Sequence, residues 1–353
     1  MMHLENTHER IHWGILGTGN IAHQFAEDLA MLPEAELWAV GSRKKARANA
    51  FGDMFHVPYR YASYEELAQD PLLDVVYVAT PHPFHYEHTM LALRAGKSVL
   101  CEKPFALNAV QASEMTQLAK QKGLFLMEAM WTRFIPAIVR VRALLQEGAI
   151  GEPRLFTADL GFANRYDPSS RFFDPALGGG ALLDLGVYPI SMSSMVFGRP
   201  QRASSLASFA PTGVDRQSGY VFTYPDGQLA VLHSSLDVES PSEAELVGTT
   251  GTIHLDKPMH HPQRIVLRHR IRTGKTEERF DLPFPGNGYQ FEAQEVMRCL
   301  REGLLEAPAM PLHESLEIMQ TMDAIREQWG LHYPGEEIPG ERDELKSSAS
   351  GAL

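Results

Sequence analysis

The stretch GILGTGNIAHQF, residues 14–25, joins two different hydrophobic patterns through a glycine-rich turn. Before the turn, residues 11–16 are IHWGIL, a short apolar run typical of a strand that is buried on both faces. After it, residues 21–32 carry apolar side chains at the spacing of one helical stripe. The turn itself has the pattern G-x-G-x-x-A. A strand before this pattern and a helix after it are the context in which it binds the pyrophosphate of a dinucleotide.

Each small residue of this turn has its own physical role. Gly17 permits the tight turn, Gly19 lets the backbone approach a pyrophosphate, and Ala22 lets the helix pack closely on the strand. The first helical residues, Asn20 and Ile21, present unpaired N–H groups to the phosphates. An ordinary glycine turn is the alternative, but the order of strand, loop and helix favours a nucleotide site.

Strand and helix patterns alternate through the first 130 residues. Short connections between such elements predict a parallel, doubly wound sheet, so we assign residues 1–128 to a Rossmann-type NAD(P)-binding domain. Strands are expected at 11–16, 35–42, 74–80, 98–101 and 124–128, and helices at 21–32, 44–55, 64–69, 84–97 and 109–122.

Residues 129–335 have a different pattern and are predicted to form a substrate-binding and oligomerisation α+β domain. Short strand-like runs separated by turns predict a large, open-faced, mostly antiparallel sheet. We expect helices to cover one face of this sheet and a second subunit to cover the other, which predicts a homodimer. Residues 336–353 are expected to form a polar tail. Strands are expected at 153–162, 202–210, 218–225, 228–238, 243–255, 264–271 and 275–284, and helices near 181–197, 288–303 and 312–330.

Composition excludes several classes of partner. The chain has 353 residues and a formal net charge of -12, which argues against general binding to nucleic acid or to anionic membranes. No run approaches the roughly 18 apolar residues of a membrane span, and the polar start of the chain lacks an apolar signal core. Two distant cysteines, Cys101 and Cys299, are expected to be reduced core thiols. We therefore expect a soluble cytoplasmic protein.

The end of the second strand bears on the choice of cofactor. An NAD site usually has an acid there, which binds the ribose 2′-hydroxyl, but this strand ends in AVGSRKKAR without a carboxylate. The hydroxyl of Ser42 and the guanidinium of Arg43 suit a 2′-phosphate. A basic, solvated first helical turn is the alternative. The sequence thus predicts NADP(H), with NAD(H) still possible.

A charged pair and a proline follow the buried strand at residues 98–101. Because ligands bind at the carboxyl ends of such strands, Lys103 is directed to the place where nicotinamide and substrate would meet. A cation there lowers the pKa of a substrate hydroxyl and stabilises an alkoxide. Glu102 can hold the lysine or a cofactor ribose, and Pro104 fixes the backbone, with a cis bond possible. The alternative is an exposed ion pair in a loop.

Three segments resemble the Gfo/Idh/MocA oxidoreductase family: GILGTGNIA (14–22), VYVATPHPFHYEHTMLALRAGKSVLCEKP (76–104) and GGGALLDLGVYPI (178–190). The resemblance covers nearly all of residues 11–335. Within that family, MEAMWTRFIP, GNGYQFEAQEVMRCL and MPLHESLEIMQTMDAIREQWGLHYP are most similar to the branch of dimeric dihydrodiol dehydrogenases and NADP-dependent D-xylose dehydrogenases. The resemblance implies a Rossmann domain, an open-faced second sheet, NADP(H) and a dimer joined through sheet faces.

The resemblance also implies three catalytic residues. Lys103 matches the lysine of the family's Glu-Lys-Pro motif, Tyr188 matches the acid/base residue, and Asp184 matches the aspartate that precedes it. If this segment is helical, Asp184 and Tyr188 share one face at i, i+4, which pairs them independently. Many members have histidine where Tyr188 stands. The tyrosine favours the dihydrodiol and aldose branch over the inositol branch.

Other residues are candidates for contacts in the same crevice. Trp131 and Arg133 are equally explained as packing between domains, and His82, His85 and His88 have metal-like spacing but lack a clear carboxylate partner, so no metal is expected. The residues predicted to contact the cofactor are Gly17, Gly19, Asn20, Ile21, Ser42, Arg43, Thr80, Pro81, His85, Glu102, Lys103, Trp131 and Arg133, and those predicted to contact substrate are Trp131, Phe162, Arg165, Arg171, Asp184 and Tyr188.

Taken together, these patterns predict an NADP-dependent oxidoreductase. It would transfer a hydride between the nicotinamide and a CH–OH carbon of a sugar or cyclic diol, such as D-xylose or a trans-dihydrodiol. The alternative is a non-catalytic NAD(P)-binding regulatory sensor of the same fold, which would not need Lys103, Asp184 and Tyr188 together.

Overall fold

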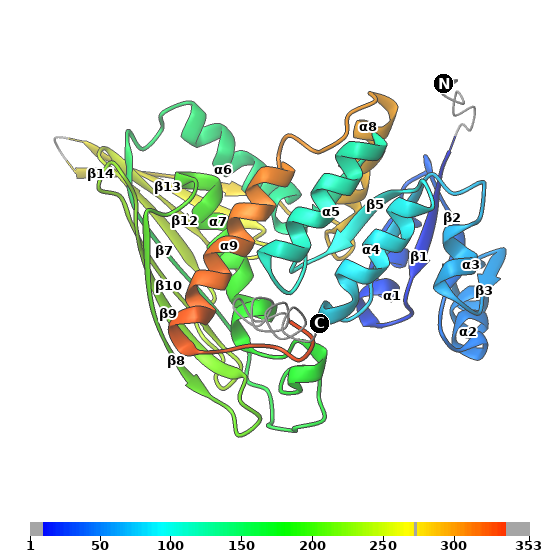
Figure 1. Ribbon diagram of the computed structural model, residues 1–353. Helices are drawn as coiled ribbons and strands as arrows, with labels where there is room; N and C mark the ends of the chain where they lie inside the picture. Colours follow the sequence, from blue (N-terminus) through cyan, green and yellow to red (C-terminus); the bar gives the residue numbers. More distant parts are fainter. Residues whose placement is uncertain (1–9, 272–273, 337–353) are drawn as a thin grey trace.

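Two β-sheets organise the protein (Figure 1). The computed structural model describes residues 10–271 and 274–336, so residues 1–9 and all but the first residue of the predicted tail at 336–353 lie outside the described residues. The first sheet has six strands in the order β3-β2-β1-β4-β5-β6, all paired in parallel. Its strands are β1 (Ile11–Leu16), β2 (Ala35–Gly41), β3 (Tyr59–Tyr61), β4 (Val75–Val78), β5 (Ser98–Glu102) and β6 (Leu126–Ala129).

The expected strand and helix alternation is confirmed in this part of the chain. The helices are α1 (Asn20–Leu29), α2 (Lys45–Phe55), α3 (Tyr64–Ala68), α4 (His85–Arg94) and α5 (Ala109–Lys122). Ser63 caps α3 and Asn108 caps α5, each accepting a backbone N–H bond. Strand β3 was not predicted, because three residues are too short to carry a period. The proposed boundary at residues 128/129 falls inside β6, so the exact domain division remains a prediction.

The second sheet has eight strands in the order β14-β13-β12-β11-β7-β10-β9-β8. Only β7 and β10 pair in parallel, so the expectation of a mostly antiparallel sheet is confirmed. Residues 243–255, expected as one run, form two strands joined by a tight turn. The strands are β7 (Pro153–Gly161), β8 (Arg202–Phe209), β9 (Asp215–Thr223), β10 (Leu229–Ser235), β11 (Ala244–Gly248), β12 (Gly251–Leu255), β13 (Arg264–Ile271) and β14 (Gly274–Asp281).

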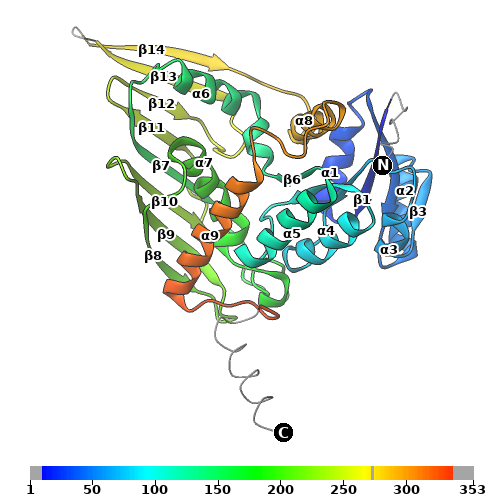
Figure 2. The same ribbon diagram turned by 45° about the horizontal axis from the view of Figure 1, so that its top comes forward.

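Helices cover one face of the second sheet. Figures 1 and 2 show α6, α7 and α9 on the side of the sheet that faces the first domain, and α9 packs on β8 while α7 packs on β7 and β10. No described element covers the opposite face. Helix α6 was not predicted from the sequence. The helices are α6 (Pro136–Gln146), α7 (Val187–Phe197), α8 (Tyr289–Arg301) and α9 (Leu312–Trp329), with short turns η1 (His82–Phe84), η2 (Trp131–Phe134), η3 (Pro175–Leu177) and the π-helical η4 (Leu182–Gly186).

One segment corrects the expectation that no run approaches a membrane span. By length and composition alone, Pro175–Phe197 could cross a membrane. Most of this segment is buried inside the fold, however, which is the position of a core helix. Its apolar character is therefore explained by packing between the second sheet and the first domain.

Candidate active site

A pocket of about 1140 Å³ lies at the carboxyl ends of the strands of the first sheet. Both domains contribute to its wall, so neither domain forms it alone. Of the residues predicted from the sequence, the pocket is lined by Gly17, Gly19, Asn20, Ile21, Ser42, Arg43, Thr80, Pro81, His85, Glu102 and Lys103 from the first domain and by Phe162, Arg171, Asp184 and Tyr188 from the second.

The glycine loop between β1 and α1 leaves room for a phosphate group. Gly17 has a φ of +107°, and a Cβ atom there would lie 2.7 Å from the carbonyl oxygen of Ala79, so only glycine fits. A Cβ atom on Gly19 would meet nothing within 4 Å, and no side chain caps the start of α1. Free N–H groups therefore face open space in the pocket, which fits a dinucleotide pyrophosphate.

The far end of the pocket, after β2, is basic. Ser42, Arg43, Lys44 and Arg47 line it, and no carboxylate lies among the described residues of that end. Lys45 turns away and donates a hydrogen bond to the backbone carbonyl of Arg60. These basic and hydroxyl side chains can hold an anionic group of a bound cofactor.

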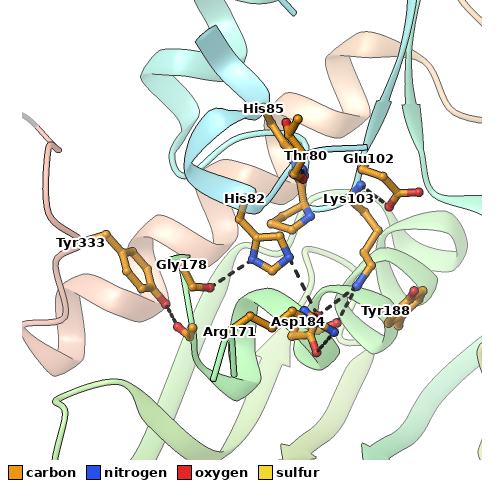
Figure 3. Close-up of polar contacts among 12 residues, drawn as sticks. Thr80, His82, His85, Glu102, Lys103, Arg171, Gly178, Asp184, Tyr188 and Tyr333 are labelled. Atoms are coloured by element: carbon orange, nitrogen blue, oxygen red, sulfur yellow. Dashed lines mark hydrogen bonds and ion pairs between the residues drawn. The ribbon is translucent and has the colours of Figure 1, made fainter. Parts of the chain in front are cut away.

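Lys103 connects the two domains at the other end of the pocket (Figure 3). Its ammonium donates a hydrogen bond of 2.9 Å to the carbonyl oxygen of Asp184, lies 3.4 Å from Oδ1 of that residue, and stands 4.7 Å from the ring centroid of Tyr188. Burial opposes the charge, but Tyr188 and Asp184 outweigh it and raise the pKa of Lys103. The lysine is therefore a fixed cation, and the bond to Pro104 is cis.

Asp184 is an anion held by several positive groups. The π-helical turn η4 directs it into the pocket, where the guanidinium of Arg171 approaches both carboxyl oxygens, at 2.9 Å and 3.4 Å. Burial opposes its charge, but Lys103 and Arg171 hold the pKa of Asp184 well below its usual value. The carboxylate is thus ionised at any working pH.

Tyr188 lies one turn beyond Asp184 and keeps its proton. Its hydroxyl oxygen accepts a hydrogen bond of 2.9 Å from the indole N–H of Trp131. Burial raises the pKa of Tyr188, and Lys103 and Trp131 lower it only in part. The protonated phenol of Tyr188 can donate its proton, and the ammonium of Lys103 over its ring stabilises the phenolate that remains.

The loops around Lys103 are braced by buried polar side chains. Glu102 accepts hydrogen bonds from the hydroxyl of Tyr77 and, at 3.1 Å, from the backbone N–H of Lys103, so it holds the backbone rather than the ammonium. The ring nitrogens of His85 lie 2.7 Å from the carbonyl oxygens of Pro104 and Thr80. His85 thus ties the Lys103 loop to the loop that follows β4.

Three residues predicted to contact ligand do not line the pocket, namely Trp131, Arg133 and Arg165. Trp131 contacts the pocket residues Tyr188, His260 and Tyr289 but does not line the pocket itself. Arg133 is 1% exposed and donates hydrogen bonds to Ser191 and Glu314, so its charge is paired inside the fold with the Glu314 carboxylate. The sequence left this possibility open, since a buried arginine and a ligand-binding arginine look the same in a local pattern.

Several pocket residues were missed as ligand contacts, among them His82, His260 and Tyr289. The sequence around His260, with Pro258 and Pro262, indicates a solvated loop, but His260 is 8% exposed and packs against the rings of Trp131 and Phe162. Tyr289 lines the pocket from the start of α8. Its place in the motif GNGYQFEAQEVMRCL was the one sequence feature that could have predicted this contact. Within the described ranges, no group of three His, Cys, Asp or Glu side chains could hold a metal.

Comparisons with known proteins agree with this geometry. Residues 11–130 match the model of an oxidoreductase family with an NAD-binding Rossmann fold, and residues 138–254 match the Gfo/Idh/MocA C-terminal domain. The trans-1,2-dihydrobenzene-1,2-diol dehydrogenase of Mus musculus is 38% identical, over 92% of this chain and 98% of its own length. The enzyme of that name from Xenopus tropicalis is 37% identical, over 91% and 99%.

Solved structures show the same two-domain architecture. A 3-ketoreductase from Actinomadura kijaniata in complex with NADP and TDP-benzene superposes with a TM-score of 0.80 at 28% identity, over 90% of this chain and 97% of that chain. An aldose-aldose oxidoreductase from Caulobacter crescentus has a TM-score of 0.80 at 24% identity, over 91% and 98%, and supports the fold alone. The chain therefore belongs to the Gfo/Idh/MocA family of NAD(P)-dependent oxidoreductases, as the resemblance in its sequence implied.

Proposed function

We propose that this protein is an NADP(H)-dependent dehydrogenase that transfers a hydride between the nicotinamide and a CH–OH carbon of a cyclic diol or aldose. The observation that carries the proposal is the convergence of Lys103, Asp184 and Tyr188 in the pocket that begins at the glycine loop. Its relatives of about 38% identity are named for a trans-dihydrodiol substrate, which supports a diol or sugar as the substrate class.

The side chains divide the work around the reacting hydroxyl. A bound nicotinamide supplies the hydride acceptor or donor. Tyr188 holds a proton at its phenolic oxygen, which it gives to a carbonyl oxygen during reduction or regains as a phenolate during oxidation. Lys103 stabilises both the phenolate and the substrate alkoxide. Asp184 fixes the lysine and offers carboxylate oxygens to substrate hydroxyls.

The basic end of the pocket supports a preference for NADP(H). Arg43, with Ser42 and Lys44, can contact a 2′-phosphate, and a carboxylate that would repel this phosphate is absent from the described residues there. The variant Arg43→Ala is expected to raise KM for NADP more than KM for NAD. Lys45→Ala is the matched control, because Lys45 faces Arg60 instead. An unchanged ratio of the two KM values in Arg43→Ala would contradict the preference.

The direct test follows NADPH absorbance with purified protein and a panel of aldoses, inositols and trans-dihydrodiols. We expect turnover with a diol or aldose and its loss in Lys103→Met. Lys120→Met is the matched control, because Lys120 is exposed on α5. Absence of turnover in both directions, together with tight NADP binding by calorimetry, would instead favour a regulatory sensor.

We also propose that the uncovered face of the second sheet binds a second copy of the chain. Leu206 is 84% exposed there, and the register places it on the same face as the exposed Val221 and Val231. Leu206→Glu is expected to reduce the mass in solution from dimer to monomer, measured by light scattering. Met54→Glu, which changes an exposed apolar residue on α2, should leave that mass unchanged. A wild-type monomer would rule the dimer out.

A further inference from the structure

His82 faces the pocket beside the carboxylate, and the mechanism above does not use it. It begins the short turn η1 after β4 and is 9% exposed. Its Nδ1 atom lies 3.0 Å from the carbonyl oxygen of Gly178, and its Nε2 atom lies 3.9 Å from Oδ1 of Asp184 (Figure 3). The ring therefore spans from the glycine run of the second domain to the centre of the site.

The hydrogen bond to Gly178 fixes the tautomer of this ring. A carbonyl oxygen only accepts, so Nδ1 of His82 must carry the hydrogen, and in the neutral ring Nε2 is then a bare acceptor. Burial lowers the pKa of His82 to about 3, so the ring is neutral at working pH. Nε2 of His82 therefore remains a hydrogen-bond acceptor, facing the pocket, at every working pH.

The loop that holds this tautomer is itself tightly positioned. A Cβ atom on Gly178, whose φ is +68°, would lie 2.9 Å from Cβ of His82, so glycine is needed for the close approach. Next to it, the hydroxyl of Tyr333 donates a hydrogen bond of 2.7 Å to the carbonyl oxygen of Gly179. The ring orientation is therefore set by contacts outside the pocket.

Two acceptors now face each other at one corner of the pocket. Nε2 of His82 and Oδ1 of Asp184 both lack hydrogen, so neither can satisfy the other. Lys103 approaches the same Oδ1 atom, at 3.4 Å. A ligand that bridges this corner must bring its own O–H or N–H donors, next to the oxygen that Lys103 contacts.

We propose that His82 Nε2 accepts a hydrogen bond from the hydroxyl adjacent to the reacting carbinol, and that this contact makes the enzyme select vicinal diols. This inference rests on the proposed function, and it names the chemical feature that cyclic diols and aldopyranoses share. The role is one of substrate recognition. His82 transfers no proton, and Tyr188 and Lys103 act on the other hydroxyl.

The test compares substrates that differ only in the neighbouring hydroxyl. D-xylose is paired with 2-deoxy-D-xylose, and trans-1,2-cyclohexanediol with cyclohexanol. Wild type is expected to favour the diol of each pair by about tenfold or more in kcat/KM, because the analogue leaves a buried acceptor unpaired. In His82→Leu this ratio should fall toward one, mainly through a higher KM for the diol. His88→Leu is the matched control, because His88 contacts Thr80 and Tyr64 instead of Asp184.

The outcomes separate this inference from the proposed function. Turnover of both members of a pair by wild type at similar kcat/KM would overturn the inference and leave the dehydrogenase activity standing. A diol preference that survives unchanged in an active His82→Leu would do the same. If His82→Leu fails to fold, the wild-type ratio alone decides. Absence of turnover with every diol and aldose would overturn both.

Discussion

The variant Asp215→Asn should remove a pH-dependent loss of stability from the protein. Asp215 begins β9 beneath the π-helical turn that carries Asp184, and its Oδ2 atom accepts the N–H of Leu182 at 2.8 Å and the hydroxyl of Ser218 at 3.1 Å. Its Oδ1 atom is buried and accepts no hydrogen bond from the described residues. Burial therefore raises the pKa of Asp215 from 3.8 to about 6.

The direction and size of the effect follow from this pKa. The folded carboxyl group binds its proton more tightly than the unfolded one, so the stability it contributes is complete below about pH 4 and is lost as the pH rises through about 6. A pKa difference of about two corresponds to about 3 kcal/mol. Asparagine does not titrate, so relative to wild type the variant should gain about 3 kcal/mol between pH 4 and pH 7.

Urea unfolding of both proteins across this pH range measures the effect. The difference between their unfolding free energies cancels the titration of all other groups. The amide also changes local hydrogen bonds at Asp215, which shifts the difference by a constant but leaves its slope with pH unaffected. A difference that stays flat from about pH 4 to pH 7 would show that the carboxyl group is not perturbed as argued.

Three further changes test other parts of the structure. Arg133→Leu should lower the free energy of unfolding in urea by about 3–5 kcal/mol, because it leaves the Glu314 carboxylate without its buried partner. Gly178→Ala should lower the free energy of unfolding by about 1 kcal/mol through backbone strain, and further through the close contact with His82, which a lower melting temperature would show. The same change should reduce kcat/KM. Glu292 is buried, and neither of its carboxyl oxygens has a hydrogen-bond partner among the described residues, so burial raises its pKa. Glu292→Gln should therefore increase the free energy of unfolding in urea at neutral pH, with no gain near about pH 4.

The first domain was predictable because its signals are local. The G-x-G-x-x-A turn lies directly between the strand and the helix that it joins, and Gly17 has the backbone conformation that the pattern requires. Lys103 follows β5 without an intervening loop, so the position of the strand also gives the position of the lysine. Parallel topology then brings such strand ends to one edge.

The residues that were misplaced depend on contacts between distant parts of the chain. Arg133 looks like a ligand-binding cation until Glu314, far along the sequence, takes its charge. His260 stands in a proline-rich turn that reads as solvated, yet its backbone carbonyl accepts a hydrogen bond from Thr132 and its ring is buried. No local period encodes such partners, because burial is decided by which elements pack together.

The site also depends on how the two domains dock. Lys103 belongs to the first sheet, whereas Asp184 and Tyr188 come from the turn and helix that cover the second sheet. Asp28 of α1 accepts the backbone N–H of Tyr289 at 2.8 Å, so the first domain caps the helix that places this tyrosine in the pocket. The Lys103–Asp184 contact and this cap both depend on how the two domains dock. Polar contacts across the domain boundary therefore set the distance between the ammonium of Lys103 and the side chains of Asp184 and Tyr188.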